Sequence, residues 1–221
     1  MRVMRPVLAI ALAVSLTPEP HFARSLPLGV VVYSDGGLIG EIDVSEGTTV
    51  YDGDRLSTAE DGGLRVNLRT ARLQLMNQSS VMVYSAENGA KADLSSGSVV
   101  FSSAAKTSIE VYAIGAEIRP AADDPTVAHV RIVGPKELRI FARRGALEFS
   151  YHGERRLIPE GAAYRVQLDP VGNDAAANSD QDQIKKAGNH KPMFLFFVIG
   201  AAAAVASMIR VFQNFESPDK P

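Results

Sequence analysis

The chain has 221 residues, of which 46% are hydrophobic and 22% are charged, and its formal net charge is −2. This length allows one or two domains with a buried core. The sequence has no cysteine, which excludes disulfides, thiolate nucleophiles and cysteine-bound metals. The near-neutral charge argues against a nucleic-acid-binding protein, because such proteins normally carry a clear basic excess.

The first residues have the pattern of a secretory signal peptide. Arg2 and Arg5 form a basic start, and the mostly apolar run 7–16 follows. A run of this length is too short to cross a hydrocarbon core of ~30 Å as a helix, but it suits the apolar part of an export signal. We therefore predict a signal peptide over residues 1–25 and export of the part that follows.

The body of the chain, residues 26–169, alternates between apolar and polar residues. The segments 64–68, 109–113 and 147–151 show this period of two, and turns rich in Asp and Gly separate such segments. Alternation of this kind is typical of half-buried strands. The pattern predicts an all-β domain of short strands, either a sandwich or a solenoid. The proline-containing loop at 120–125 predicts a division of this domain into two halves.

The C-terminal part predicts a membrane anchor. The polar residues 170–192 suit a flexible linker, and the apolar residues 193–212 are long enough for one transmembrane helix. Gly200 and Ala204 are four residues apart, a spacing of small residues that suits self-association of helices. Residues 213–221 form a short tail. Lysines before the helix favour the reverse orientation, but the export signal favours a domain outside the cytoplasm.

The middle of the chain resembles the FecR domain family of bacterial envelope proteins. The matching stretches are GEIDV at 40–44, VYDGDRLST at 50–58, GLRVNL at 63–68, LQL at 73–75, SVMV at 80–83 and LSSGSV at 94–99. The resemblance is best over 40–101 and weaker to 161. It implies a β-rich periplasmic domain. The best-known members pass a signal from an outer-membrane receptor to a cytoplasmic sigma-factor regulator.

Several glycines are expected at structural turns. Gly97 and Gly145 each precede an aliphatic residue and then a Phe at the same spacing, which suggests a tight turn into a strand that is used twice. The FecR resemblance places Gly53, Asp54 and Gly161 at turns as well.

No catalytic or metal-binding motif is present in the sequence, so we predict no enzyme activity, no cofactor and no metal. His129 and His152 are expected on strand surfaces. Five aspartates could offer oxygen ligands to calcium, but they fall in three separate turns, where Asp commonly bonds the neighbouring backbone. These are Asp52, Asp54, Asp61, Asp123 and Asp124.

One basic patch is a candidate binding site. If residues 145–153 form a hairpin, five arginines gather at one end of the domain, where they could hold an anionic polymer or the carboxylates of a partner. A solvated turn with local acids is the alternative. The five are Arg139, Arg143, Arg144, Arg155 and Arg156.

These features favour a non-enzymatic envelope protein, anchored by one helix in the bacterial inner membrane, whose periplasmic or extracellular β domain binds a protein or glycan partner. Sheet edges are one route for such binding. The alternative is a transmembrane signalling component that relays an envelope signal to a regulator. A cell-wall-acting enzyme is the third hypothesis, because two convergent carboxylates can lie far apart in a sequence.

Overall fold

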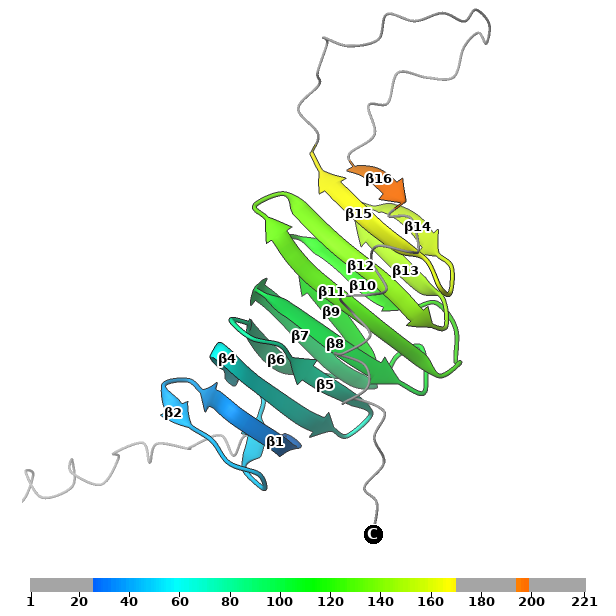
Figure 1. Cartoon of the computed structure of the whole chain (residues 1–221). Coiled ribbons are helices and arrows are strands. Elements are labelled where there is room, and N and C mark those ends of the chain that lie inside the picture. Colours follow the sequence, from blue (N-terminus) through cyan, green and yellow to red (C-terminus); the bar gives the residue numbers. More distant parts are fainter. Residues whose placement is uncertain (1–25, 170–193, 199–221) are drawn as a thin grey trace, which may run out of the picture.

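The computed structural model describes residues 26–169 and 194–198, and these ranges form strands, turns and no helix (Figure 1). The prediction of an all-β domain is confirmed. The predicted signal peptide, linker and tail (1–25, 170–192 and 213–221) lie outside the described residues. Within the described ranges, no helix has the length and apolar character needed to cross a membrane.

The strands follow one another closely along the chain. They are β1 (Pro27–Ile39), β2 (Ile42–Asp43), β3 (Thr49–Tyr51), β4 (Arg55–Leu68), β5 (Ala71–Leu75), β6 (Ser80–Ala86), β7 (Gly89–Ser96), β8 (Ser98–Ser103), β9 (Ile109–Ala113), β10 (Ala116–Pro120), β11 (Thr126–Gly134), β12 (Glu137–Arg144), β13 (Leu147–Tyr151), β14 (Glu154–Ile158), β15 (Ala163–Leu168) and β16 (Phe194–Val198).

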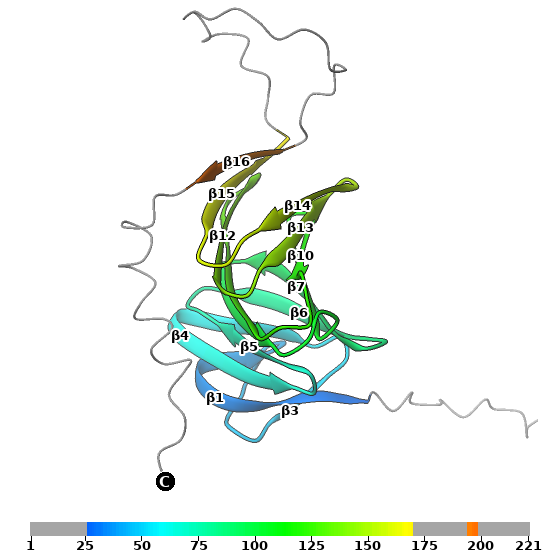
Figure 2. The same ribbon diagram turned by 90° about the vertical axis from the view of Figure 1, so that its right-hand side faces the viewer.

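All sixteen strands belong to one sheet, in the order β14-β13-β10-β9-β7-β6-β4-β5-β8-β11-β12-β15-β16. Off this path, β1 pairs with β4, and β2 and β3 pair with β1. The long strand β4 serves both halves of this order. Its residues 55–57 pair with β6, and its residues 64–67 pair with β5. The sheet curls at β4 into two facing walls (Figure 2). We call β5, β8, β11, β12, β15 and β16 the first wall, and β6, β7, β9, β10, β13 and β14 the second wall.

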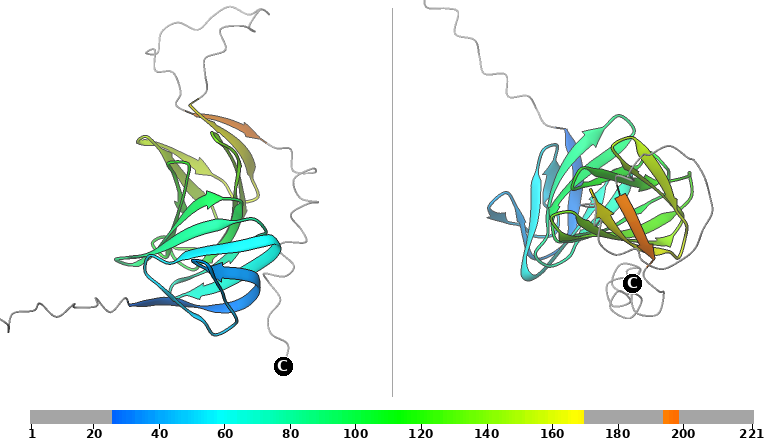
Figure 3. Two further views of the ribbon diagram at one scale, coloured as in Figure 1. Left: turned by 90° about the vertical axis from the view of Figure 1, so that its left-hand side faces the viewer. Right: turned by 90° about the horizontal axis from the view of Figure 1, so that it is seen from above.

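The core lies between the two walls, where residues from both form a single buried cluster. Phe101 from the first wall and Phe149 from the second are fully buried. Burying a side chain of this size contributes about 1.5–3 kcal/mol each. Views from the other side and from above show the same two walls around this core (Figure 3). The alternation in the sequence is therefore that of a sheet with one face on the core and one face outward.

Two of the predicted turn glycines stand where the chain crosses between the walls. Gly97 joins β7 to β8 with a φ of 76°, and Gly145 joins β12 to β13 with a φ of 68°. A Cβ on Gly97 would lie 2.5 Å from the carbonyl oxygen of Gln78, and one on Gly145 would lie 2.7 Å from Thr126 Oγ1. Both the backbone conformation and the available space therefore require glycine at these crossings.

The predicted transmembrane helix over 193–212 is described only at Phe194–Val198, and these residues form strand β16 rather than a helix. The physical reason lies in the residues themselves. Aromatic and β-branched side chains suit a strand, and β15 offers an edge for them to pair with. Gly200 and Ala204 lie outside the described residues, so their role in helix packing stays a prediction.

The loop at 120–125 lies between β10 on the second wall and β11 on the first. Strands from both sides of this loop belong to the same sheet and contribute to the same core. The loop is therefore one more crossing between walls.

Candidate partner-binding face

The two walls differ in the charges that their strands carry. The strands of the first wall carry six arginines and one acid, Glu137, whereas those of the second wall carry four cations and five acids. The six arginines are Arg72, Arg131, Arg139, Arg143, Arg144 and Arg165. Since the whole chain has a net charge of −2, the first wall is a local concentration of positive charge.

Three of these arginines lie in one row across the first wall. Arg131 on β11 is directly opposite Arg139 on β12, and Arg139 is directly opposite Arg165 on β15. All three are exposed and belong to the outer face. Side chains directly opposite each other have Cβ atoms about 4.5–5.5 Å apart, and like charges in such pairs destabilise a sheet. The row is therefore unfavourable for the domain alone.

Among the described residues, an acidic side chain pairs with only one end of this row. Arg165 Nη2 donates a hydrogen bond to Glu137 Oε2 at 2.6 Å, and this bond raises the pKa of the Arg165 guanidinium. Arg131 and Arg139 form no ion pair and no side-chain hydrogen bond with any other residue in the described ranges. Two adjacent guanidinium groups on this face therefore have no acidic partner within residues 26–169 and 194–198.

A buried histidine lies beside the row. The expectation of a surface His129 was wrong, because its side chain is only 6% exposed on β11, between Val100 and Phe141 of the neighbouring strands. Burial, and to a smaller extent the charge of Arg131, lowers the pKa of His129 to about 4. His129 is therefore neutral at pH 7 and adds no charge to the face.

The outer face of the second wall is organised in the opposite way. Glu148 Oε1 accepts a hydrogen bond from Arg119 Nη2 at 2.7 Å, and its carboxylate also lies 3.9 Å from Lys106 Nζ and 3.7 Å from Arg155 Nε. The bond from Arg119 holds the pKa of Glu148 below its usual value. Further ion pairs on this face are Lys91–Glu110 and Arg119–Glu117.

The five arginines of the predicted basic patch do not form one patch. Arg139, Arg143 and Arg144 are on β12 in the first wall, whereas Arg155 and Arg156 are on β14 in the second. In the sheet, β12 pairs with β11 and β15, and β14 pairs with β13. The residues expected to join the two groups do form a hairpin, with its turn at 152–153, but that hairpin stays within the second wall.

Sequence reasoning missed the residues that complete the row. Arg131 and Arg165 are 8 and 26 residues from Arg139, and no local motif relates them. Only the register of three strands brings them into line. A signal was present nonetheless, because the five first-wall strands before β16 contain one acid among them.

A shallow recess of about 320 Å³ lies at the end of this face. Arg72 and Arg144 line it, together with the hydroxyl-bearing residues Ser102 and Thr126. The recess adds two cations to the same face, although Ala71, Ala104, Pro125 and Val127 also line it and make much of its surface apolar. Its chemistry suits a carboxylate.

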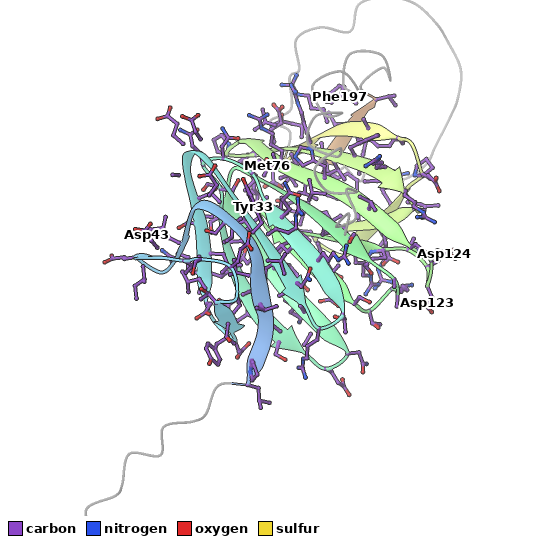
Figure 4. All side chains as sticks on the ribbon, turned by 60° about the horizontal axis from the view of Figure 1, so that its bottom comes forward. Tyr33, Asp43, Met76, Asp123, Asp124 and Phe197 are labelled. Atoms are coloured by element: carbon purple, nitrogen blue, oxygen red, sulfur yellow. The ribbon has the colours of Figure 1, made fainter. Side chains whose placement is uncertain are left out.

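The remaining predicted turn glycines have left-handed conformations, and the side chains of Asp52, Asp54 and Asp123 accept hydrogen bonds from the backbone. Gly53 and Gly161 both have a φ near 80°, at 86° and 77°. Asp54 Oδ2 accepts a hydrogen bond from the Tyr51 N–H at 2.7 Å. Asp123, which Figure 4 shows beside Asp124, accepts one from the Lys106 N–H at 2.8 Å. Within the described ranges, no three His, Asp or Glu side chains come together as a metal site.

Comparisons with known proteins do not assign the chain to a family. No family model matches the chain, and no curated protein matches it. Two crystal structures, at 1.65 and 2.50 Å resolution, resemble it with a TM-score of 0.48 and 11% identity. Both are of a protein from Parabacteroides distasonis ATCC 8503 that is provisionally described as an anti-sigma factor. The match covers 70% of this chain but only 64% or 63% of that chain, which is less than two thirds. Membership of the FecR family stays a prediction.

Proposed function

We propose that the chain is a non-enzymatic, protein-binding component of an envelope signalling system, and that the outer face of the first wall binds a carboxylate-rich segment of its partner. The observation that carries this proposal is the row of Arg131, Arg139 and Arg165. Like charges in register cost the free domain stability. Carboxylates from a partner would remove that cost and gain charge-assisted hydrogen bonds.

The chemistry of the row favours carboxylates. A guanidinium group offers a planar fork of donors that matches a carboxylate. The domain already uses this match, since Glu137 accepts from Arg165 and Glu148 accepts from Arg119. A partner segment that places acidic side chains along the row would extend the same arrangement to Arg131 and Arg139.

The signalling role is supported by the resemblance to the FecR family, whose best-known members work through contacts with other proteins. A location in the bacterial envelope follows from the predicted signal peptide and belongs to the same proposal.

Binding of an acidic peptide to the full chain tests this proposal. The probe is a labelled ten-residue peptide of alternating Glu and Ser, titrated at low salt and at 0.3 M salt. We expect measurable binding at low salt, a loss of binding at high salt, and binding about five-fold weaker for Arg139→Gln. Arg156→Gln is the matched control, because it removes the same charge from an exposed strand position on the second wall.

Two outcomes would overturn the proposal. An equal loss of binding in Arg139→Gln and Arg156→Gln would mean that the peptide responds to overall charge and not to the row. Tighter binding of a sulfated polysaccharide, or of vesicles with anionic lipid, than of the peptide would replace the protein partner by a glycan or a membrane.

A further inference from the structure

Strand β16 reaches the sheet in an unusual way. β15 ends at Leu168 and β16 begins at Phe194, so the two strands are not joined by a short turn. The two strands pair antiparallel over five residue pairs, from Tyr164–Val198 to Leu168–Phe194. Among the described strands, β16 pairs with β15 alone and ends the sheet on that side.

Two side chains of β16 hold it against the core. The ring centroids of Phe194 and Phe196 lie 5.2 Å and 5.1 Å from that of Phe149 on the second wall, in edge-to-face arrangements. Phe196 also packs edge-to-face on Tyr164 of β15, at 5.3 Å. Phe194 is 4% exposed. The rings of Phe194 and Phe196 therefore connect β16, which lies beside β15 in Figure 2, to the second wall.

The two side chains that follow these positions, Leu195 and Phe197, lie on the opposite face of β16 and face outward. Leu195 and Phe197 are 39% and 52% exposed, and Figure 4 shows Phe197 at this outer end of the molecule. The strand thus contributes two aromatic anchors at alternate positions together with the backbone hydrogen bonds of one edge. This is the chemistry by which a sheet edge recognises an added strand, with backbone bonds for affinity and alternate side chains for specificity.

We propose that the outer edge of β15 is an acceptor site for an extended segment with large aromatic side chains at two alternate positions. Phe194–Val198 is its intramolecular occupant, and a partner segment of the same pattern takes its place. The site consists of the β15 backbone edge, Tyr164 on β15 and Phe149 across the core. It lies apart from the arginine row in its chemistry and does not depend on the function proposed above.

The sequence gives a reason for the exchange. Residues 194–198 begin the apolar run 193–212 that we predict as a membrane helix. Five residues cannot pair with β15 and lie in a bilayer at the same time. Insertion of this run into a membrane therefore opens the acceptor site to a partner, and release from the membrane closes it.

Peptide binding to two matched variants of the full chain tests the acceptor site. Phe194→Ser with Phe196→Ser removes the two anchors and vacates the site. Leu195→Ser with Phe197→Ser is the control, because it changes only the outward side chains. The probe is a labelled peptide, Phe-Thr-Phe-Thr-Val flanked by lysines. We expect saturable binding to the vacated variant that is at least about ten-fold tighter than to the control. A peptide with Ser at both Phe positions should not bind.

The proposal is overturned if the vacated variant keeps a β-type circular dichroism spectrum yet fails to bind the peptide, or if the control binds equally well. If the vacated variant does not fold, amide hydrogen exchange measured on the unmodified chain tests the proposal instead. The amides of β16 should then exchange at least about ten-fold faster than those of β12, because an exchangeable strand opens without global unfolding. Equal protection of β16 and β12 would refute exchange. None of these measurements involves Arg139, so this proposal and the proposed function fail separately.

Discussion

The two walls of the sheet share one core but differ in how their outward charged side chains are paired. On the second wall, Glu148 gathers Arg119, Lys106 and Arg155 around one carboxylate, so that charges on neighbouring strands are neutralised within the domain. On the first wall, cations stand opposite cations in register. Alternation places residues outward equally well in both walls, so the fold alone does not explain this difference.

The difference indicates which of the two outer faces would be stabilised by a binding partner. Paired charges on a half-exposed face contribute modestly to stability and require no partner. A row of like charges has the opposite effect on the free domain, and a complementary surface would relieve it. We therefore predict that removal of an arginine changes the free energy of unfolding in opposite directions on the two walls.

The largest effect is expected where the two walls are joined. Gly97→Ala would force a side chain into a left-handed conformation and against the backbone of Gln78. Strain and overpacking together should lower the free energy of unfolding by about 4 kcal/mol. Urea unfolding followed by circular dichroism measures this loss.

Gly161→Ala is the matched control for this crossing. Gly161 has nearly the same φ, 77°, but a Cβ there would meet nothing within 4 Å. We expect a loss of about 1 kcal/mol, from the backbone conformation alone. Similar losses in both variants would show that the crossing at Gly97 is not under steric constraint.

The next largest effect is a loss of folding stability in acid that depends on His129 of the first wall. The pKa of His129 is about 4 in the folded chain, against an ordinary value of 6.5. A lowered His pKa contributes stability that is complete above pH 6.5 and is lost as the pH falls toward 4, by about 3 kcal/mol at most. Unfolding measured from pH 7 to pH 4 should show this slope, and His129→Phe should flatten it. A slope that survives the substitution would place the titrating group elsewhere.

Removing the central carboxylate of the second wall should have a smaller effect. Glu148→Gln weakens the bond from Arg119 and leaves three cations around a neutral amide. We expect a loss of about 1 kcal/mol at pH 7, because the cluster is partly open to solvent. Since the pKa of Glu148 is lowered in the fold, its contribution is present above pH 4.5 and is lost only in more acidic solution. If the variant is as stable as the original chain at pH 7, these ion pairs contribute nothing to the free energy of unfolding.

The fold was largely predictable from the sequence because a period of two determines which residues reach the core. Leu64, Val66 and Leu68 face inward as their alternation indicates, and the glycine at 97 stands at a turn that requires it. The strand at 194–198 was not predictable, because an apolar run of that length suits a bilayer as well as a sheet edge.

The candidate site was only partly predictable. Arg139, Arg143 and Arg144 were predicted to share one patch with Arg155 and Arg156, because a hairpin at 145–153 was expected to bring the two groups together. Strand register, which depends on tertiary pairing, placed Arg131 and Arg165 beside Arg139 instead. Proximity along a chain is a poor guide to neighbours in a curled sheet whose chain crosses repeatedly from one wall to the other.

The most direct test of the account compares the free energy of unfolding of Arg139→Gln and Arg119→Gln at low ionic strength. Both variants remove one arginine from an outward strand position. We predict that Arg139→Gln is more stable than the original chain by about 0.5 kcal/mol, with the gain fading in high salt, and that Arg119→Gln is less stable. A loss of stability in Arg139→Gln would contradict the account, because it would show that the row holds the domain together and is not left open for a partner.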